Sequence, residues 1–501
     1  MTISRRVVLL SAGSTAMTSL LACPAFSVAR RADGAAPPAW VPELKKSLTM
    51  AAHTLTKTLK PWTGPKTVAL PEDYGFIPNS TAPATVAIQA AVDALAAQGG
   101  GTVRLTVGDY VSGTIELRSN IRLEVSKGAR LLGSLSLSDY PEKVAARKTV
   151  MDSNMGMNQS LIFAEGVTNI SVAGDGIIDG RGSKANFPGK QTVGTTPGRP
   201  FLIRVIDCKK VHIVGIRLHD AACWMQNYLN CEDLLIEDIF VSNQANFNND
   251  GLDIDGCRRV IVRNSIINSE DDAMCFKGAS QRPMEDVLVE NCQFYTSCNA
   301  IKFGTDSQGD FRRILVRNVT IGGTPAHMPA INRRTASSGI TWAIVDGGTL
   351  EDVYVHDARI FRSKSPLYLR LGDRGRVRPE DPVPAPGTMR RIVFENISGK
   401  ENDSRGSYFL GIADRKIEDV VLKNVHLWGA GSASEGPDES EIDQMRKRYP
   451  DAQNLKLAPA YGLWARHVRR LTLINVDFVV DQPDPRPKIL TKTDVDDVVI
   501  A

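Results

Sequence analysis

The chain has 501 residues, of which 23% are charged and 42% are hydrophobic, and this is ordinary for a soluble globular protein with a large core. Its net charge of +4 is small for this length, and the basic residues are spread along the chain without a block of five or more. The charge therefore gives no argument for a nucleic-acid partner or for a membrane surface.

Residues 1–29 have the organisation of a signal peptide, with a basic start, an apolar stretch and a small-residue end. The segment SRRVVLL (4–10) resembles a twin-arginine export signal, and cleavage after Ala29 fits the small residues there. A second interpretation takes LLAC (20–23) as a lipobox, which would make Cys23 a lipidated N-terminus. We expect a periplasmic or secreted protein, and no later stretch approaches the roughly 18 apolar residues of a membrane span.

Eight cysteines occur, and seven of them follow the expected signal peptide. An odd number in a long chain is not a disulfide framework, although an isolated disulfide stays open in an exported protein. No CxxC pair is present, which argues against a structural zinc site.

Residues 30–66 are predicted to be a linker and a short N-terminal segment to which we assign no element. The sequence TVAIQAAVDALAAQ (85–98) has the pattern of an amphipathic helix, which Gly99 to Gly101 end. Short strands with glycine turns follow over 102–134. We expect the helix to cap the open N-terminal end of the repeated structure that comes next.

Short alternating strands, each ending in Asn, Asp or Gly, recur from residue 212 onward. The corner residues are spaced 26 or 27 residues apart in the centre and more widely later, at Asp238, Asn264, Asn291, Asn318, Asp357, Asn396, Asn424 and Asn475. This period, with strands and no helices between, predicts an all-β fold, a right-handed parallel β-helix. The alternative, a β-propeller, lacks its characteristic sequence marks.

Stacked coils lie about 4.8 Å apart, so equivalent residues should form ladders. Corner asparagines can hydrogen-bond one another, and Cys208, Cys231 and Cys257 occupy a second equivalent position that suggests buried packing. We expect the β-helix domain to cover 67–480, with a polar insertion at 429–459. Residues 481–501 are then a C-terminal tail.

Acidic residues cluster on both sides of the apolar strand VIVRNSII (260–267). Asp250 and Asp271 are 21 residues apart, close to one coil, so Asp250 should lie near the Asp271-Asp272 pair on the same face. Two carboxyl groups about 6.5–9.5 Å apart, with a water between them, are the machinery of an inverting glycosidase. A calcium site or ordinary turn chemistry would also use such residues, and the spacing alone leaves these alternatives open.

The motifs resemble glycoside hydrolase family 28, the polygalacturonase family. The family signature, Asn-x-Asp-Gly followed about one coil later by Gly-Asp-Asp, corresponds to 248–251 and 270–272. DYG (73–75), GGG (99–101) and GDGIIDGRG (174–182) also match, so that the resemblance covers roughly 67–480.

The resemblance implies that Asp271 is the general acid and that Asp250 and Asp272 activate the attacking water. It implies hydrolysis of α-galacturonosidic bonds in pectin-type polysaccharide or oligosaccharides with inversion at the anomeric carbon, without a metal or a cofactor. The partner is therefore a uronate-containing saccharide, and we expect a monomer.

The chain departs from the family at the substrate-binding motifs. Asn299 stands where the family has the His of Gly-His-Gly, and the strand GITWAIVDGG (339–348) lacks the usual Arg-Ile-Lys. We expect Lys302, Arg370 and Arg374, together with Asn299, to bind the acidic sugar instead. Long loops after residues 322, 375 and 429 could wall one end of the groove, which favours exo action.

Three other functions stay open from the sequence. One is a rhamnogalacturonan-directed or other-sugar glycosidase on the same fold. Another is a calcium-dependent polysaccharide lyase, and the third is a non-catalytic carbohydrate-binding β-helix.

Overall fold

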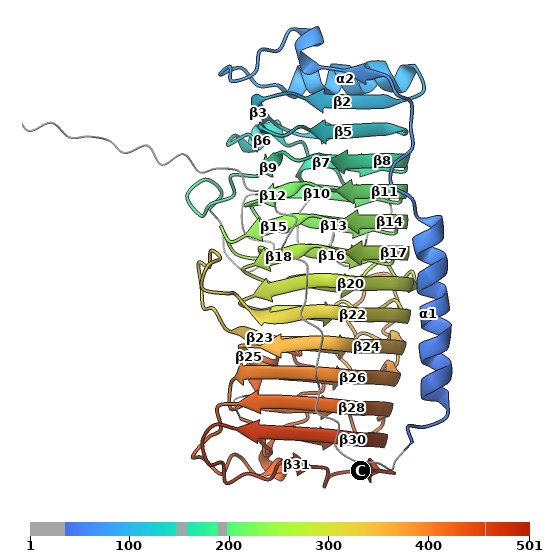
Figure 1. The fold of residues 1–501 in the computed structure, drawn as a ribbon, viewed down its shortest axis with the longest axis vertical. Helices are drawn as coiled ribbons and strands as arrows, with labels where there is room; N and C mark the ends of the chain where they lie inside the picture. Colours follow the sequence, from blue (N-terminus) through green and yellow to red (C-terminus); the bar gives the residue numbers. More distant parts are fainter. Residues whose placement is uncertain (1–35, 147–148, 150–157, 189–197, 456) are drawn as a thin grey trace, which may run out of the picture. The chain divides into compact units, whose positions relative to one another are not determined.

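The structure is a computed structural model that describes residues 36–146, 149, 158–188, 198–455 and 457–501. The expected signal peptide, its twin-arginine segment and Cys23 lie outside the described residues. The chain winds through stacked coils whose strands pair in parallel (Figure 1). This confirms the predicted parallel β-helix.

One sheet, sheet A, begins as two columns of short strands that merge into single long ones. The first column is β2 (Gly101–Leu105), β5 (Ile121–Val125), β8 (Thr168–Ala173), β11 (Lys209–Val214), β14 (Glu232–Glu237) and β17 (Arg258–Arg263). The second is β3 (Gly108–Ser112), β6 (Ala129–Gly133), β9 (Ile177–Asp179), β12 (Arg217–His219), β15 (Phe240–Asn243) and β18 (Ile266–Ser269). Both pair with β20 (Met284–Thr296), and the stack continues through β22 (Phe311–Gly323), β24 (Thr349–Phe361), β26 (Thr388–Asn402), β28 (Ile417–Gly429) and β30 (Val468–Val480).

The other sheet, sheet B, takes one strand from each coil. Its order is β4 (Ile115–Glu116), β7 (Ser160–Glu165), β10 (Phe201–Ile206), β13 (Gln226–Leu229), β16 (Leu252–Asp255), β19 (Met274–Lys277), β21 (Asn299–Phe303), β23 (Ala336–Ile344), β25 (Ser363–Leu371), β27 (Ser407–Leu410), β29 (Leu463–Arg466) and β31 (Ile489–Leu490). The hydrophobic core, with aliphatic and aromatic side chains, fills the space between the two sheets.

The asparagine ladder forms as the sequence predicts. Asn291 donates its side-chain amide to Asn264 at 3.2 Å, and Asn318 donates to Asn291 at 2.7 Å. Asn424 and Asn475 continue the ladder further along the stack. All of these corner residues have positive φ, a conformation that Asn tolerates better than other side chains with a Cβ. The repeated Asn therefore marks each sharp bend of the coil.

The cysteine ladder is also buried packing. The backbone N–H of Cys231 donates to the sulfur of Cys257 at 3.2 Å, and Cys208 lies in the same core cluster. Each of the seven cysteines among the described residues is a free thiol.

The N-terminal end of the stack is covered by α2 (Thr85–Ala97), which confirms the predicted helix. Ile88, Ala91, Val92 and Leu95 point into the core from this helix. A short 3-10 turn (Pro71–Tyr74) and β1 (Val68–Ala69) precede it, and β1 pairs with β2. The helix therefore closes the apolar interior at the first coil.

The structure contains a helix that the sequence analysis did not predict. Helix α1 (Trp40–Thr58) lies across the strands of sheet A, along the stack (Figure 1). Its 19 residues extend about 28 Å, close to the roughly 29 Å that seven coils occupy. Its apolar side, Val41, Leu48, Ala52 and Leu55, continues into Leu59 just after the helix. Together they pack against one residue from each of seven coils: Leu235, Ile261, Leu288, Leu315, Tyr354, Val393 and Val421.

Polar contacts fix the direction of α1. Near its start Lys45 forms an ion pair with Glu395 of β26 at 2.6 Å, and Glu395 also accepts from Tyr354 and Lys423. Burial raises the pKa of Glu395, but hydrogen bonds from these three groups outweigh burial and lower it to about 2. The N-terminal end of the helix is thereby held at the later coils.

Truncation of the apolar side of α1 should destabilise the protein. Leu48 is 2% exposed, and we expect Leu48→Ala to lower the free energy of unfolding by about 2–5 kcal/mol, because it leaves a cavity between α1 and sheet A. Met50 lies on the same helix and is 61% exposed, so Met50→Ala should change it by less than about 0.5 kcal/mol. Chemical denaturation of both variants tests this, and equal effects would show that α1 does not contribute through burial.

The polar insertion expected at 429–459 contains two short 3-10 helices, Glu439–Glu441 and Ala452–Asn454. Residues beyond 480 still pair with the stack through β31, β32 (Val495–Asp496) and β33 (Val499–Ile500). A further 3-10 turn spans Leu137–Asp139. In the part of the chain that the structure describes, no helix combines the length and the hydropathy needed to cross a membrane.

Candidate active site

The acidic residues lie just ahead of neighbouring strands of sheet B. Asp250 precedes β16, and the Asp271-Asp272 pair precedes β19 on the next coil. The backbone N–H of Gly251 donates to the carbonyl of Asp272 at 2.8 Å, and that of Asp271 donates to the carbonyl of Asn249 at 3.4 Å. These two bonds place Asp250 against the Asp271-Asp272 pair, which is the proximity that the one-coil spacing predicts.

Asp272 is held by two side chains from β21. Its Oδ1 accepts from Asn299 Nδ2 at 2.6 Å, and its Oδ2 accepts from Lys302 Nζ at 2.7 Å. Burial raises the pKa of Asp272, but the ammonium groups of Lys302 and Lys277 and the two hydrogen bonds outweigh burial and lower it below its usual range. Asp272 is therefore ionised at neutral pH.

Asp271 has the opposite electrostatics. Burial raises its pKa and the negative charge of Asp272 raises it further, while Lys302 and a hydrogen bond from the Cys298 thiol lower it only in part. Asp271 is also more exposed than Asp272, so its carboxyl group can reach a bound molecule. Two adjacent carboxyl groups with pKa values pushed apart are suited to act as an acid and a base.

Asp250 is 3% exposed and holds its proton more strongly than Asp272 does. Burial raises its pKa well above the ordinary value, and the charges of Asp253, Asp271 and Asp272 add to this. The family resemblance gives Asp250 and Asp272 equal parts in activating water. Their electrostatics differ, however, and Asp272 is the carboxylate that is ready to accept a proton.

A second cation lies beside the acidic cluster. Lys277 Nζ is 3.2 Å from Asp253 Oδ1 and 4.6 Å from the ring centroid of Trp224. Burial raises the pKa of Asp253 to about 7, although Lys277 opposes this. Buried ammonium groups from two successive strands, Lys277 on β19 and Lys302 on β21, therefore lie beside the carboxylates.

Of the predicted substrate-binding residues, Asn299 and Lys302 lie at the carboxylates. Asn299 Oδ1 accepts from Ser338 at 2.7 Å and from Thr341 at 3.1 Å, so its amide group is oriented toward Asp272. Lys302 also contacts Tyr449, whose hydroxyl lies 3.3 Å from its Nζ. Tyr449 comes from the insertion, and no motif in the sequence singles it out.

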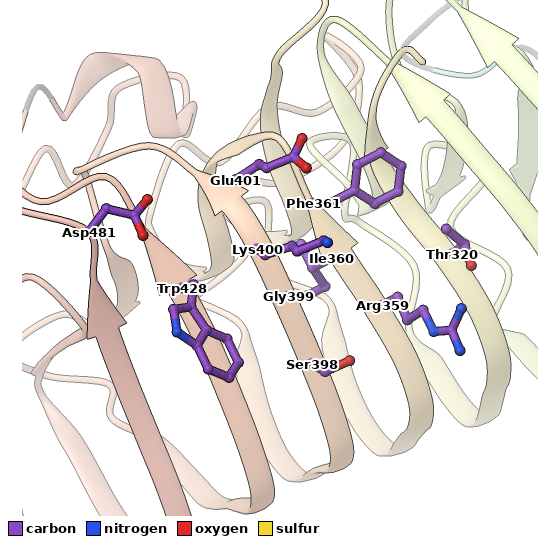
Figure 2. Close-up of a pocket in the computed structure, with 10 residues that line it drawn as sticks. All are labelled: Thr320, Arg359, Ile360, Phe361, Ser398, Gly399, Lys400, Glu401, Trp428 and Asp481. Atoms are coloured by element: carbon purple, nitrogen blue, oxygen red, sulfur yellow. The ribbon is translucent and has the colours of Figure 1, made fainter. Parts of the chain in front are cut away.

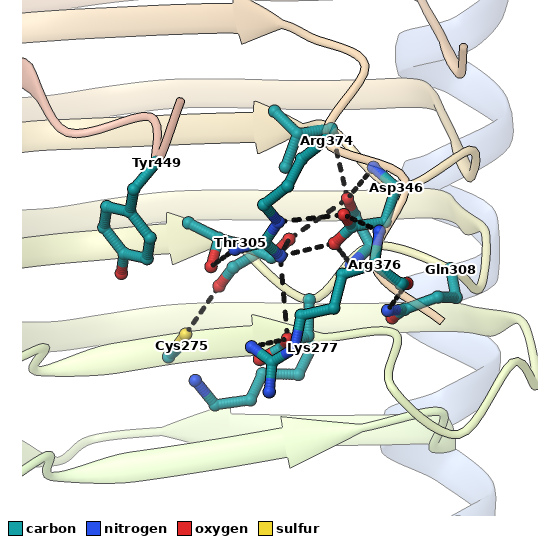
Figure 3. Close-up of polar contacts among 12 residues, drawn as sticks. Cys275, Lys277, Thr305, Gln308, Asp346, Arg374, Arg376 and Tyr449 are labelled. Carbon is teal, nitrogen blue, oxygen red and sulfur yellow. Dashed lines mark hydrogen bonds and ion pairs between the residues drawn. The ribbon is translucent and has the colours of Figure 1, made fainter. Parts of the chain in front are cut away.

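Arg374 belongs to a network with Asp346 and Thr305. Its Nε donates to Asp346 at 2.9 Å and its Nη2 donates to the carbonyl of Thr305 at 2.8 Å. Figure 3 shows Arg374 between this network and Tyr449, whose ring centroid is 6.0 Å away. Arg370 is only 1% exposed and donates to the carbonyl of Gln444 in the insertion. The structure thus does not bring Arg370 and Arg374 to Asp272 as it brings Lys302, and their substrate-binding role stays a prediction.

One group of potential metal ligands coincides with the acidic pair. A carboxylate oxygen from each of Asp271 and Asp272 and the sulfur of Cys298 lie within 4.8 Å of one another. Burial raises the pKa of Cys298 well above its usual value, so the thiol keeps its proton. Calcium prefers oxygen ligands, and Lys302 already neutralises Asp272, so this donor set fits calcium poorly.

The buried carboxyl of Asp255 allows a test of these electrostatics by stability. The pKa of Asp255 is raised to about 6, mainly by burial. The folded state is therefore stabilised by protonated Asp255 at low pH, and this stability is lost as the pH rises through about 6. We expect Asp255→Asn to be more stable than wild type at pH 8, by up to about 3 kcal/mol, and to gain little at pH 4. Thermal melts at both pH values check this.

Asp175 is the matched control because it is exposed at a turn. Asp175→Asn should change the melting temperature equally little at the two pH values. A pH-independent effect of Asp255→Asn would contradict the expected ionisation of Asp255.

A comparison with known families agrees with the fold. The family model described as "Glycosyl hydrolases family 28" matches residues 114–325, a range that includes Asp250, Asp271 and Asp272. A probable polygalacturonase of Vitis vinifera is 24% identical over 384 residues, covering 73% of this chain and 75% of that protein. An exo-poly-alpha-D-galacturonosidase of Dickeya chrysanthemi is 23% identical over 51% of this chain and 50% of its own length.

Among solved structures, the hyperthermoactive exopolygalacturonase of Thermotoga maritima has the same fold. It superposes with a TM-score of 0.64 at 16% identity, over 76% of this chain and 92% of that chain. The parallel β-helix with carboxyl groups from neighbouring coils close together, taken with the family match, defines a glycoside hydrolase. Residues 114–325 match glycoside hydrolase family 28, the polygalacturonase family, and the chain is similar to polygalacturonases.

Proposed function

We propose that this protein hydrolyses α-galacturonosidic bonds in pectin-type oligosaccharides or polysaccharide, with inversion at the anomeric carbon. We propose that it acts from one end of the saccharide. The observation that carries the proposal is the contrast within one pair: burial and the charge of Asp272 raise the pKa of Asp271, whereas Lys302 and Asn299 bind Asp272 and lower its pKa.

In the proposed reaction Asp271 donates its proton to the glycosidic oxygen as the bond to the anomeric carbon breaks. Asp272 accepts a proton from a water molecule, whose oxygen attacks the anomeric carbon from the opposite face. Asp250 lies against both groups, and its negative charge at higher pH would oppose ionisation of Asp271. Because water attacks directly, the product has the inverted configuration at the anomeric carbon, and no covalent intermediate forms.

The cations near the carboxylates support a uronate substrate. Lys277 and Lys302 form ion pairs with Asp253 and Asp272, and their positive charge beside the carboxylates suits an acidic sugar. The Arg-Ile-Lys motif is absent from 339–348. We propose that Lys277 and Lys302 take over its role of binding the sugar carboxylate, from other positions in the sequence.

The insertion supports exo action. Ala452, Leu455 and Ala458 pack on the outer face of sheet B, over Tyr408 and Trp464 of the later coils. Tyr449 then extends to Lys302, so the insertion contacts sheet B from its later coils up to the strand that carries Lys302. Two of the compared proteins are named as exo-acting enzymes, which agrees with this arrangement.

The test is the product formed first from saturated oligogalacturonides of defined length. We expect release of a short saturated sugar from one end, and proton NMR should detect the inverted anomer before mutarotation. Rhamnogalacturonan and neutral polysaccharides run in parallel, each with and without a chelator. A random mixture of product lengths would contradict exo action, retention of configuration would contradict the direct attack by water, and chelator-sensitive release of an unsaturated uronate would identify a lyase instead.

A further inference from the structure

A hollow of about 770 Å³ lies on the outer face of sheet A, away from the carboxylates on sheet B. Five successive long strands or their ends line it, β22, β24, β26, β28 and β30 (Figure 2). Its size is within the range of small-molecule and saccharide sites. The proposed reaction gives this hollow no part.

Strand alternation builds the hollow. Ile360 of β24 points into the core and is fully buried, so its neighbours Arg359 and Phe361 point outward. Gly399 of β26 is opposite Ile360, and a Cβ there would come within 2.2 Å of the Ile360 carbonyl. Gly399 therefore shares the core-facing register of Ile360, and its neighbours Ser398 and Lys400 face the hollow from β26.

Two aromatic rings face the hollow from different coils. Phe361 lies on β24, and Trp428, which is 41% exposed, lies on β28. Strands two coils apart are about 10 Å apart, so the two rings are separated by the one intervening strand, β26. An exposed tryptophan beside a hollow is the side chain on which the apolar face of a sugar ring stacks.

Positive charge lies between the rings. Lys400 of β26 is in register with Phe361, and Figure 2 shows its ammonium group directed across the hollow toward Arg359. Glu401 lies at one edge, where it is 3.7 Å from Arg362, and this arginine offsets its charge. Asp481 lies at the same edge as Glu401 (Figure 2). The centre therefore combines aromatic surface with cations, which suits a ligand that has both apolar faces and carboxylates.

We propose that this hollow is a second, non-catalytic site that binds a segment of a uronate-containing saccharide. A sugar ring stacks on Trp428, its carboxylate pairs with Lys400 and Arg359, and the hydroxyl groups of Thr320 and Ser398 hydrogen-bond the sugar. The ligand class rests on the proposed function, whereas the site itself does not. Such a site holds a polymer on the protein while the carboxylates on sheet B act on one of its ends.

The test uses the full chain carrying Asp271→Asn, so that the ligand is not consumed. Calorimetry with saturated oligogalacturonides should give two binding sites per chain, and addition of Trp428→Ala should leave one. Tyr74→Ala is the matched control, because Tyr74 is a surface aromatic with 40% exposure at the other end of the stack, and it should leave two. In the active enzyme, Trp428→Ala should raise the KM for polymer about tenfold and leave kcat and KM for a trimer unchanged, since one lost stacked aromatic contact is worth about 1–1.5 kcal/mol.

A single site in both backgrounds would overturn the proposal. Equal Trp428-dependent binding of a neutral polysaccharide would overturn the uronate class, which Lys400→Met tests from the protein side. Concentration-dependent dimerisation that Trp428→Ala abolishes would show that a second copy of the chain occupies the hollow. If no uronate is hydrolysed and Trp428-dependent uronate binding persists, the proposed function fails and the second site stands.

Discussion

Replacement of Asp271 by Asn should lower kcat by about 10²–10⁴-fold, the contribution of a positioned general acid. The asparagine can still accept the hydrogen bond that the backbone N–H of Asp272 donates to Asp271 at 3.0 Å, so the local fold should persist. The variant should therefore bind oligogalacturonides and melt at or above the wild-type temperature, since a buried carboxyl has been removed. Initial rates on oligomers, with binding measured separately, test this.

Glu270→Gln is the control for that experiment. Glu270 is the neighbouring residue, burial raises its pKa to about 7, and its side chain accepts a hydrogen bond from Asn332 in the loop after β22. We give it no part in the reaction, and the Gln variant should retain most of the activity. Loss of activity in both variants would show that the segment tolerates no change, whereas full activity of Asp271→Asn would remove Asp271 from the reaction.

Replacement of Lys302 by Met should have the second largest effect, on stability and on pH dependence together. Lys302 and Asp272 are both buried, with side chains 6% and 3% exposed, and removal of one member of such a pair costs about 3–5 kcal/mol. In the wild type the lowered pKa of Asp272 gives stability that is present above about pH 4 and is lost as pH falls through the lowered value. The variant should therefore show its largest deficit at neutral and alkaline pH and a smaller one at pH 4.

The same change should move the pH–rate profile. Without the ammonium group the pKa of Asp272 rises, so the acid limb of kcat/KM should move to higher pH. Lys302→Arg keeps a cation and should restore much of the stability and the position of the limb. A rise in KM without movement of the limb would show instead that Lys302 contacts only the substrate.

The coil repeat was predictable because every coil of a β-helix needs the same residue types at equivalent positions. Each bend needs a residue that tolerates positive φ, and each inward position needs an apolar side chain, so Asn264, Asn291 and Asn318 recur at the coil length. The carboxylates were predictable for the same reason, since one-coil spacing places Asp250 beside Asp271. Stacking of coils carries both results, although 21 residues separate Asp250 from Asp271 and the asparagines recur every 26 or 27.

The features that were missed depend on contacts between distant segments. Helix α1 has apolar residues at Val41, Leu44, Leu48, Ala52, Leu55 and Leu59, a spacing of three or four that does indicate a helix. Its many threonines have low helix propensity and obscure this pattern. Nothing in the local sequence of Tyr449 or Arg370 reveals that the insertion brings one to Lys302 and covers the other, because 147 residues separate Tyr449 from Lys302.

The position of α1 has a consequence for the order in which the protein is assembled. Chains are made from the N-terminus, so α1 is complete long before β28, which contributes Val421 to the surface that the helix covers. Until that last coil is in place, the apolar side of α1 lacks part of its partner. Helix α1 is thus made early but completes its packing late. Its full set of contacts can form only when all seven coils beneath it have folded.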